Sequence, residues 1–369
     1  MRLLSLEVQN YRNICAARLE PGRELTVICG NNGQGKTNLL EAIWLLTGGK
    51  SFRGGKDAEL VRRGEAFAVL EADTQRDRPE GCEPAEPAHI RMTVGTPEAA
   101  KPGRYAAVNG AAPKRAAALA GSFPAVVFDP GHLSLVKGSP EGRRRFLDAA
   151  LCQLYPGYVT LLRRYSRLVT QKNALLKSYW QTPDANGLLD VFDEKLAESG
   201  AAVSAKRQEY LALIEPEITG TYRDIASGSE TLAIQYEPSF EPEKGLAPVL
   251  RESRARDIAA GFCTAGPHRE DFSISIDGRA AKVFASQGQQ RSAVLSLKLA
   301  EAAGAQKITG EHPVMLLDDV LSELDETRQS YLLSRMEHRQ TIVTACDPDL
   351  FRRTSGRVYR MEGGILHAL

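Results

Sequence analysis

Gly30-Asn31-Asn32-Gly33-Gln34-Gly35-Lys36-Thr37 is the stretch that decides the fold. It matches the phosphate-loop pattern G-x-x-x-x-G-K-[ST] at every fixed position. A short apolar run, Leu25–Cys29, precedes it, and residues 38–46 follow with apolar side chains at helical spacing. A strand that feeds a glycine loop into a helix N-terminus directs backbone N–H groups and the helix dipole at one point. The sequence therefore predicts a nucleoside-triphosphate site.

The loop residues have distinct expected roles. Lys36 is expected to reach the β- and γ-phosphates and to act in catalysis, and the Thr37 hydroxyl to bind Mg²⁺. A glycine-rich turn that matches by accident is the alternative, and the strand before and helix after disfavour it. The predicted contacts to ATP along this segment are Gly30, Asn31, Asn32, Gly33, Gln34, Gly35, Lys36, Thr37 and Asn38.

A second landmark is an apolar run, residues 314–317, that ends in the carboxylates Asp318 and Asp319. A buried parallel strand with acids at its C-terminal end is what a Walker B segment needs. We expect Asp318 to hold Mg²⁺ and Asp319 to orient and polarise the attacking water as a catalytic group. Alone, the pair also fits a strand that ends in a solvated acidic turn.

A third segment, residues 286–292, opens a predicted helix about 30 residues before the acidic pair, with the sequence Ser-Gln-Gly-Gln-Gln-Arg-Ser. A Ser/Gly/Gln turn at a helix N-terminus is another preorganised phosphate site. Two such sites far apart in sequence are easiest to understand if they face one nucleotide across a dimer interface. The alternative is a plain polar N-cap.

Composition limits the class of protein. The 369 residues carry 47 Lys and Arg against 46 Asp and Glu, so any nucleic-acid site must be a local patch. Six cysteines are scattered without a C-x-x-C pair, which favours reduced thiols over disulfides or zinc. The absence of a signal-peptide core or of 18 consecutive apolar residues predicts a cytoplasmic protein without a membrane partner.

The middle of the chain reads as helical. Residues 141–178 and 188–214 have helical spacing around a loop at 181–187, and Pro156 is expected to break the first stretch. These helices form either an antiparallel arm inserted into the ATPase or an ordinary helical subdomain packed on the sheet. The predicted division is an N-terminal ATPase part at 1–138, a helical insert at 139–225 and a C-terminal ATPase part at 226–369.

The whole set resembles the ABC-type ATPases, whose signature segment and S-x-L-D loop flank Walker B. More closely it resembles the RecF family of bacterial recombination mediators, which is related to the heads of SMC proteins. The matching segments span nearly the whole chain: residues 10–13, 30–38, 135–140, 143–148, 266–271 and 286–291.

The resemblance implies an α/β fold: an ABC-type P-loop ATPase head with two lobes, mixed sheets and an inserted helical arm. It also implies two ATP molecules with Mg²⁺, sandwiched in a head-to-tail dimer. Ser286, Gly288 and Gln289 would then lie at the γ-phosphate of the partner's ATP. Arg12 and Asn13 would lie near the adenine or the phosphates.

Three departures from the transporter pattern point to slow hydrolysis. Asp319 stands where transporters place Glu, and residues 344–347 lack the switch histidine. Near residues 128–130 no glutamine offers a Q-loop. A shorter carboxylate without that histidine is a poor catalyst, so ATP would act mainly to hold the dimer.

The function implied by the resemblance is an ATP-gated clamp on duplex or gapped DNA, with weak DNA-dependent ATPase activity. Such a clamp would help RecR- and RecO-like mediators load recombinase onto single-stranded gaps during replication and repair. The alternatives are an ABC-type ATPase subunit of another assembly, such as a transporter or SMC-like head, and a P-loop small-molecule kinase.

Local basic clusters are the candidates for DNA contact through the phosphate backbone. One such basic cluster comprises Arg163, Arg164, Arg167 and Lys172. For each cluster the alternative is a solvated helix face with intrahelical pairs to acids, and for residues 143–145 it is also a structural role at the base of the arm. The predicted DNA contacts are Arg53, Lys56, Arg62, Arg63, Lys114, Arg115, Arg143 and Arg144.

Overall fold

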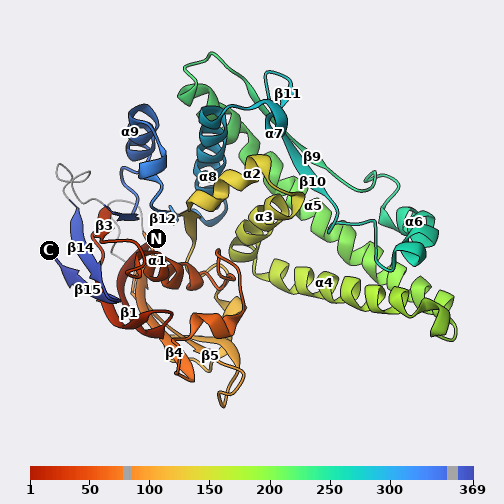
Figure 1. Cartoon of the computed structure of the whole chain (residues 1–369), viewed down its shortest axis with the longest axis horizontal. Helices are drawn as coiled ribbons and strands as arrows, with labels where there is room; N and C mark the ends of the chain where they lie inside the picture. Colours follow the sequence, from red (N-terminus) through yellow and green to blue (C-terminus); the bar gives the residue numbers. More distant parts are fainter. Residues whose placement is uncertain (78–82, 84, 347–355) are drawn as a thin grey trace.

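The phosphate loop follows the third strand, β3, in a mainly parallel six-stranded sheet (Figure 1). The computed structural model describes residues 1–77, 83, 85–346 and 356–369. Four neighbouring strands of this sheet, at residues 25–29, 341–345, 314–318 and 125–128, are almost fully buried, as their continuous apolar runs predict. In spatial order the strands are β15 (Ile365–Ala368), β14 (Arg357–Glu362), β3 (Leu25–Cys29), β13 (Thr341–Ala345), β12 (Val314–Asp318) and β8 (Ala125–Phe128).

A second, antiparallel six-stranded sheet forms the other side of the ATPase core. Residues 67–74 pair antiparallel with residues 88–95, with Leu70 opposite Met92. The spatial order is β2 (Ile14–Leu19), β1 (Arg2–Tyr11), β4 (Phe67–Gln75), β5 (Ala88–Gly95), β6 (Gly103–Val108) and β7 (Lys114–Arg115).

Helix α1 (Lys36–Leu45) lies between the two sheets. Leu39 and Ile43 share one hydrophobic core with Leu70 of the antiparallel sheet and Leu316 of the parallel sheet. Alternate residues of the parallel strands, such as Leu317, face a second core built with the helices. The parallel sheet is thus covered on both faces, and the phosphate loop is fixed at its C-terminal edge.

Most of the remaining helices, together with a small third sheet, pack around the second core. Pro156 breaks the helical stretch as predicted. The elements are α2 (Ser134–Lys137), α3 (Pro140–Leu154), α4 (Pro156–Lys177), α5 (Ala185–Ile225), α6 (Leu246–Ala260), α7 (Ala281–Phe284), α8 (Gln287–Thr309), α9 (Glu326–Ser334), β9 (Leu232–Glu237), β10 (Asp271–Ile276), β11 (Arg279–Ala280), and the 3-10 helices η1 (Asp57–Leu60), η2 (Ala116–Leu119), η3 (Pro130–Leu133), η4 (Tyr179–Gln181) and η5 (Leu321–Glu323).

Helix α5 differs most from the sequence prediction. It continues through Pro216 to Ile225, well past the predicted end at residue 214. Its C-terminal half packs on α8, where an added Cβ on Gly304 would lie 2.5 Å from Ile214 Cγ2. Its N-terminal half runs beside α4 away from the head, with α6 near their far end (Figure 1). We call α4, residues 185–205 and α6 the arm; the same long helix is therefore both arm and packed subdomain.

Candidate nucleotide site

The phosphate loop has a backbone that only glycine adopts readily. Gly30 has φ 146°, and a Cβ there would lie 2.3 Å from the Met361 carbonyl oxygen. Gly35 has φ 115° and caps α1, so helix N–H groups point into the loop. Lys36 Nζ donates to the carbonyl oxygens of Gly30 and Asn31, the latter at 3.0 Å, which holds the ammonium over the loop.

Neighbouring segments hold the loop in place. Asn13 Nδ2 donates to the Gly33 carbonyl at 3.2 Å, and Asn38 Nδ2 donates to Asn13 Oδ1 at 2.7 Å. On the other side, the turn between β14 and β15 donates two backbone N–H groups to Gln34, at 3.0 Å and 2.6 Å. Of the predicted contacts near the chain start, Asn13 therefore lies at the loop.

Arg12 is placed differently. Its guanidinium binds both oxygens of Glu41, at 2.7 Å and 2.8 Å, and Glu41 is 0% exposed in α1. Burial alone would raise the pKa of Glu41, but the Arg12 guanidinium and the Ser51 hydroxyl leave that pKa below its usual range. Arg12 thus fixes α1 to the antiparallel sheet, and its contact with a nucleotide stays a prediction.

Asp318 and Thr37 meet at the edge of the sheet. Asp318 Oδ1 accepts from Thr37 Oγ1 at 2.9 Å and from Thr344 Oγ1 at 2.7 Å. The carboxylate is 7% exposed, and burial, with help from the charges of Asp129 and Asp319, raises its pKa. A buried carboxylate beside a hydroxyl, next to a phosphate loop, fits Mg²⁺, which takes few protein ligands and completes its shell with phosphates and water.

Asp319 turns the chain away from β12 in the left-handed region, with φ 51°. Its N–H donates to Thr344 Oγ1 at 3.0 Å, and its carbonyl accepts from Ser322 Oγ at 2.7 Å. Within the described ranges the Asp319 carboxylate has no hydrogen bond or ion pair, so it is free to bind water. A non-glycine residue held in this conformation is typical of functional sites.

Sequence reasoning missed Asp129. Phe128 of β8 pairs with Leu317 of β12, so the next residues, Asp129 and Asp318, end adjacent parallel strands at the same edge. Asp129 Oδ1 accepts from the Gly131 N–H at 2.8 Å, and the Asp129 N–H donates to His132 Nδ1 at 3.0 Å. A carboxylate therefore occupies the edge where a Q-loop glutamine was sought. The apolar run ending in Asp-Pro was the available signal.

The signature segment, residues 286–292, forms a capping box at the start of α8. Ser286 Oγ accepts from the Gln289 N–H at 3.2 Å, and Gln289 Oε1 accepts from the Ser286 N–H at 2.8 Å. Gln289 Nε2 donates to Glu230 Oε1 at 2.8 Å, and Glu230 Oε2 accepts from Tyr222 OH at 2.6 Å. The segment therefore forms an N-cap that is tied to α5, and its contact with a nucleotide stays a prediction.

Helix α9, which follows the loop after Walker B, contacts the same helix through Arg328. Arg328 Nε donates to Ser292 Oγ at 2.9 Å, and Arg328 Nη2 lies 3.3 Å from where a Cβ on Gly288 would be. In Figure 1, α7, which leads into α8, lies well away from α1. The signature segment and the phosphate loop are therefore not brought together within one copy.

The predicted DNA contacts divide into two groups. The first lies on the antiparallel lobe, where Arg53 Nη1 donates to Asn38 Oδ1 at 2.7 Å and Arg115 lies 4.5 Å from the Tyr105 ring centroid. Lys56, Arg62, Arg63 and Lys114 belong to this group. Their contact with DNA stays a prediction.

The second group, at the start of α3, is structural. Arg143 is 5% exposed, binds both oxygens of Asp271 at 2.7 Å and donates to the carbonyls of Leu135 and Gly138. Asp271, 128 residues away, thus holds Arg143 in a structural network, and the contact of Arg143 with DNA stays a prediction. Arg144 donates to the Glu270 carbonyl at 2.6 Å beside it.

The cysteines and the apolar character of the helices bear on the expectations drawn from composition. The five cysteines within the described ranges are free, and Cys82 lies outside them, as does Asp347. Among the helices described, none is both long and apolar enough to cross a membrane.

The chain is similar to known proteins over nearly its whole length. The family model described as RecF/RecN/SMC N terminal domain matches residues 2–363. The DNA replication and repair protein RecF of Heliobacterium modesticaldum is 37% identical over 380 residues, covering 99% of both chains.

Two solved structures are similar over the full chain. "Structure of the recombination mediator protein RecF-ATPrS in RecFOR pathway" has a TM-score of 0.89 at 34% identity, covering 100% of this chain and 98% of that one. The corresponding RecF-ATP structure has a TM-score of 0.88 at 33% identity, covering 100% of this chain and 97% of that one. These matches confirm the expected ABC-type, SMC-like ATPase head, and the chain belongs to the RecF family.

Proposed function

We propose that this chain is an ATP-dependent DNA-binding protein of replication and recombinational repair, which closes as a head-to-tail dimer on ATP. The observation that supports this best is the cluster of Thr37, Asp318 and Thr344 beside a formed phosphate loop. One copy holds that cluster and a capped signature segment at separate places. A second copy would bring the signature Ser286 and Gly288 to the γ-phosphate.

The relatives support the same cofactor and pathway. The solved relatives are named as RecF with ATP in the RecFOR pathway, and the curated relative as a DNA replication and repair protein. We infer that this chain binds ATP, acts in the cytoplasm on duplex or gapped DNA, and works with RecR- and RecO-type mediators. The proposed division is an ATPase head at 1–138 and 226–369 with a helical insert at 139–225.

The contacts at the phosphate loop support the proposed catalytic roles. Thr37 and Asp318 would hold Mg²⁺, which when bound offsets charge on the β- and γ-phosphates. Lys36 would bind those phosphates, and Asp319 would orient water with its free carboxylate. Asp319 is one methylene shorter than Glu, and β13 is followed by Cys346 instead of histidine, so hydrolysis is slow. Bound ATP would favour the closed dimer by roughly 3–4 kcal/mol.

A mobility shift with gapped DNA, run with ATP, with ADP and without nucleotide, tests this function. Sedimentation under the same conditions measures the dimer fraction. ATP, in contrast to ADP, is expected to raise both the DNA affinity and the dimer fraction. The Lys36→Arg variant is expected to keep the fold and to show a weaker response to ATP. Equal dimer fractions in all three conditions would refute the proposal.

A further inference from the structure

Helix α4 is basic without any acidic residue. Its 22 residues include Arg163, Arg164, Arg167, Lys172 and Lys177 and neither Asp nor Glu. The whole chain is nearly balanced, with 47 basic and 46 acidic residues. The usual explanation for helical arginines, pairing with acids on the same helix, is therefore excluded for α4.

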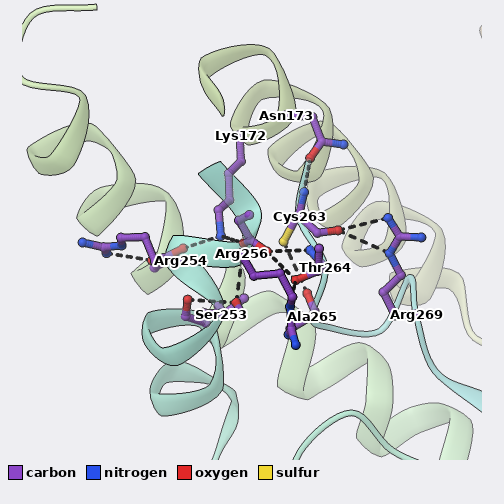
Figure 2. Close-up of polar contacts among 12 residues, drawn as sticks. Lys172, Asn173, Ser253, Arg254, Arg256, Cys263, Thr264, Ala265 and Arg269 are labelled. Carbon is purple, nitrogen blue, oxygen red and sulfur yellow. Dashed lines mark hydrogen bonds and ion pairs between the residues drawn. The ribbon is translucent and has the colours of Figure 1, made fainter. Parts of the chain in front are cut away.

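The inward side of α4 is fixed by a polar core at the end of the arm (Figure 2). Lys172 is 0% exposed and lies 2.8 Å from Asp193 Oδ1 and 2.9 Å from Asp257 Oδ2. Asn173 Oδ1 accepts from the Cys263 N–H at 2.7 Å. These contacts to α5, α6 and the segment after α6 fix the rotation of α4 about its axis.

The other cations lie on the opposite side. At 3.6 residues per turn, Arg167 and Lys177 lie within about 40° of Arg163 around the helix, and Lys172 lies about 180° from it. Arg163, Arg167 and Lys177 are exposed. Thr170 and Ala174 lie between these cations on the same face of α4, so no large apolar side chain covers this face.

These three cations are also unpaired. Arg164 points elsewhere and pairs with Glu198 of α5 at 3.0 Å. Arg163, Arg167 and Lys177 have no ion pair with any residue in the described ranges. Clusters on other helices behave differently: Arg145, for example, pairs with Glu141 one turn away at 2.7 Å. The charge of Arg163, Arg167 and Lys177 is therefore available for a partner.

We infer that the outward face of α4, formed by Arg163, Arg167 and Lys177, is a contact surface for the phosphate backbone of duplex DNA. From Arg163 to Lys177 the helix rises about 21 Å at 1.5 Å per residue. That length equals about six base-pair steps along the duplex axis at 3.4 Å each. Cations and hydroxyls without aromatic groups suit backbone contact and not base readout. This surface rests on the proposed function and adds the arm to the DNA-binding region.

The test is a double charge reversal, Arg163→Glu with Arg167→Glu, in the full chain. Duplex affinity is measured with ATP at several salt concentrations, together with ATP affinity and ATP-dependent dimerisation. The matched control reverses two exposed but paired cations, Arg18→Glu with Lys244→Glu, for the same change in net charge.

The α4 variant is expected to bind duplex at least tenfold more weakly, and the slope of log affinity against log salt to flatten by about 2. Its ATP affinity and dimerisation should match wild type, and the control should keep near wild-type DNA affinity. Unchanged DNA affinity and slope in the α4 variant would overturn this surface while leaving the proposed function intact. Wild-type protein that ignores DNA in ATP would instead overturn both.

Discussion

Replacing Glu230 by alanine is expected to weaken ATP-dependent dimerisation without affecting ATP binding to the single copy. Glu230 joins two elements: it accepts from Gln289 Nε2 of the signature cap at 2.8 Å and from Tyr222 OH of α5 at 2.6 Å. Burial, and then Glu230 itself, raise the pKa of Tyr222, so the phenol stays a donor. The alanine variant frees the Gln289 amide, and Ser286 loses its fixed cap.

The expected loss of dimer affinity follows from these two hydrogen bonds. A hydrogen bond to a charged group contributes about 1.5–3 kcal/mol in net terms. Because Glu230 is only half-buried, we assign about 1 kcal/mol of this hydrogen-bond energy to holding each signature segment in position for the dimer. A symmetric dimer uses two such segments, which gives about 2 kcal/mol and a roughly 30-fold weaker dimer.

Sedimentation equilibrium with a non-hydrolysable triphosphate measures the dimer constant, and nucleotide titration at low protein concentration measures binding to the single copy. Glu230→Gln keeps an acceptor for Gln289 and should restore most of the dimer affinity. Tyr222→Phe removes only one bond and should lie between. A dimer constant within twofold of wild type for Glu230→Ala, with altered thermal stability, would refute the positioning role and leave Glu230 as a structural residue.

Three further predictions test other parts of the molecule. Asp318→Asn should lower ATP affinity at least tenfold in Mg²⁺ but little in EDTA, as measured by calorimetry. Lys172→Met leaves the buried Asp257 without a cation, while Asp193 keeps only Arg254, and should cost about 3–5 kcal/mol of stability, seen as a lower melting temperature of the helical region. Burial lowers the pKa of His268, so the unfolded chain binds the extra proton. Stability should therefore fall as pH drops below about 6.5, and His268→Asn should flatten that dependence in melting curves from pH 7.5 to 5.

Local patterns were sufficient for the nucleotide-binding elements. The strand, glycine loop and helix around Lys36, the acidic strand end at Asp318 and the helix start at Ser286 all follow from short segments with strict backbone requirements. Each segment is one turn or one strand long, so its conformation depends little on distant residues. Pro156 broke its helical stretch for the same reason.

Features set by distant partners could not be predicted. Arginines of α3 and α4 look alike in sequence, yet Arg143 pairs with Asp271 across the fold, whereas Arg163 has no ion pair in the part of the chain that the structure describes. A proline usually breaks or kinks a helix, but α5 continues through Pro216 because Ile214 and Ile218 on either side are buried in the core that holds α5 to α8. Asp129 became visible only through the register of β8 with β12.

Helix α5 gives a physical reason for DNA contact and ATP binding to affect each other. Its 41 residues, about 60 Å long, begin near the polar core that fixes α4 and end beside the signature cap at Tyr222. A displacement of α4 by bound duplex would therefore move the element that holds Glu230. Coupling between two binding equilibria is reciprocal, so if ATP raises duplex affinity by a given factor, duplex must tighten ATP-dependent closure by the same factor. Because the Glu230 contact lies between the two sites, Glu230→Ala should reduce both factors together, while the α4 charge reversal should remove the effect of DNA on closure and leave closure by ATP alone.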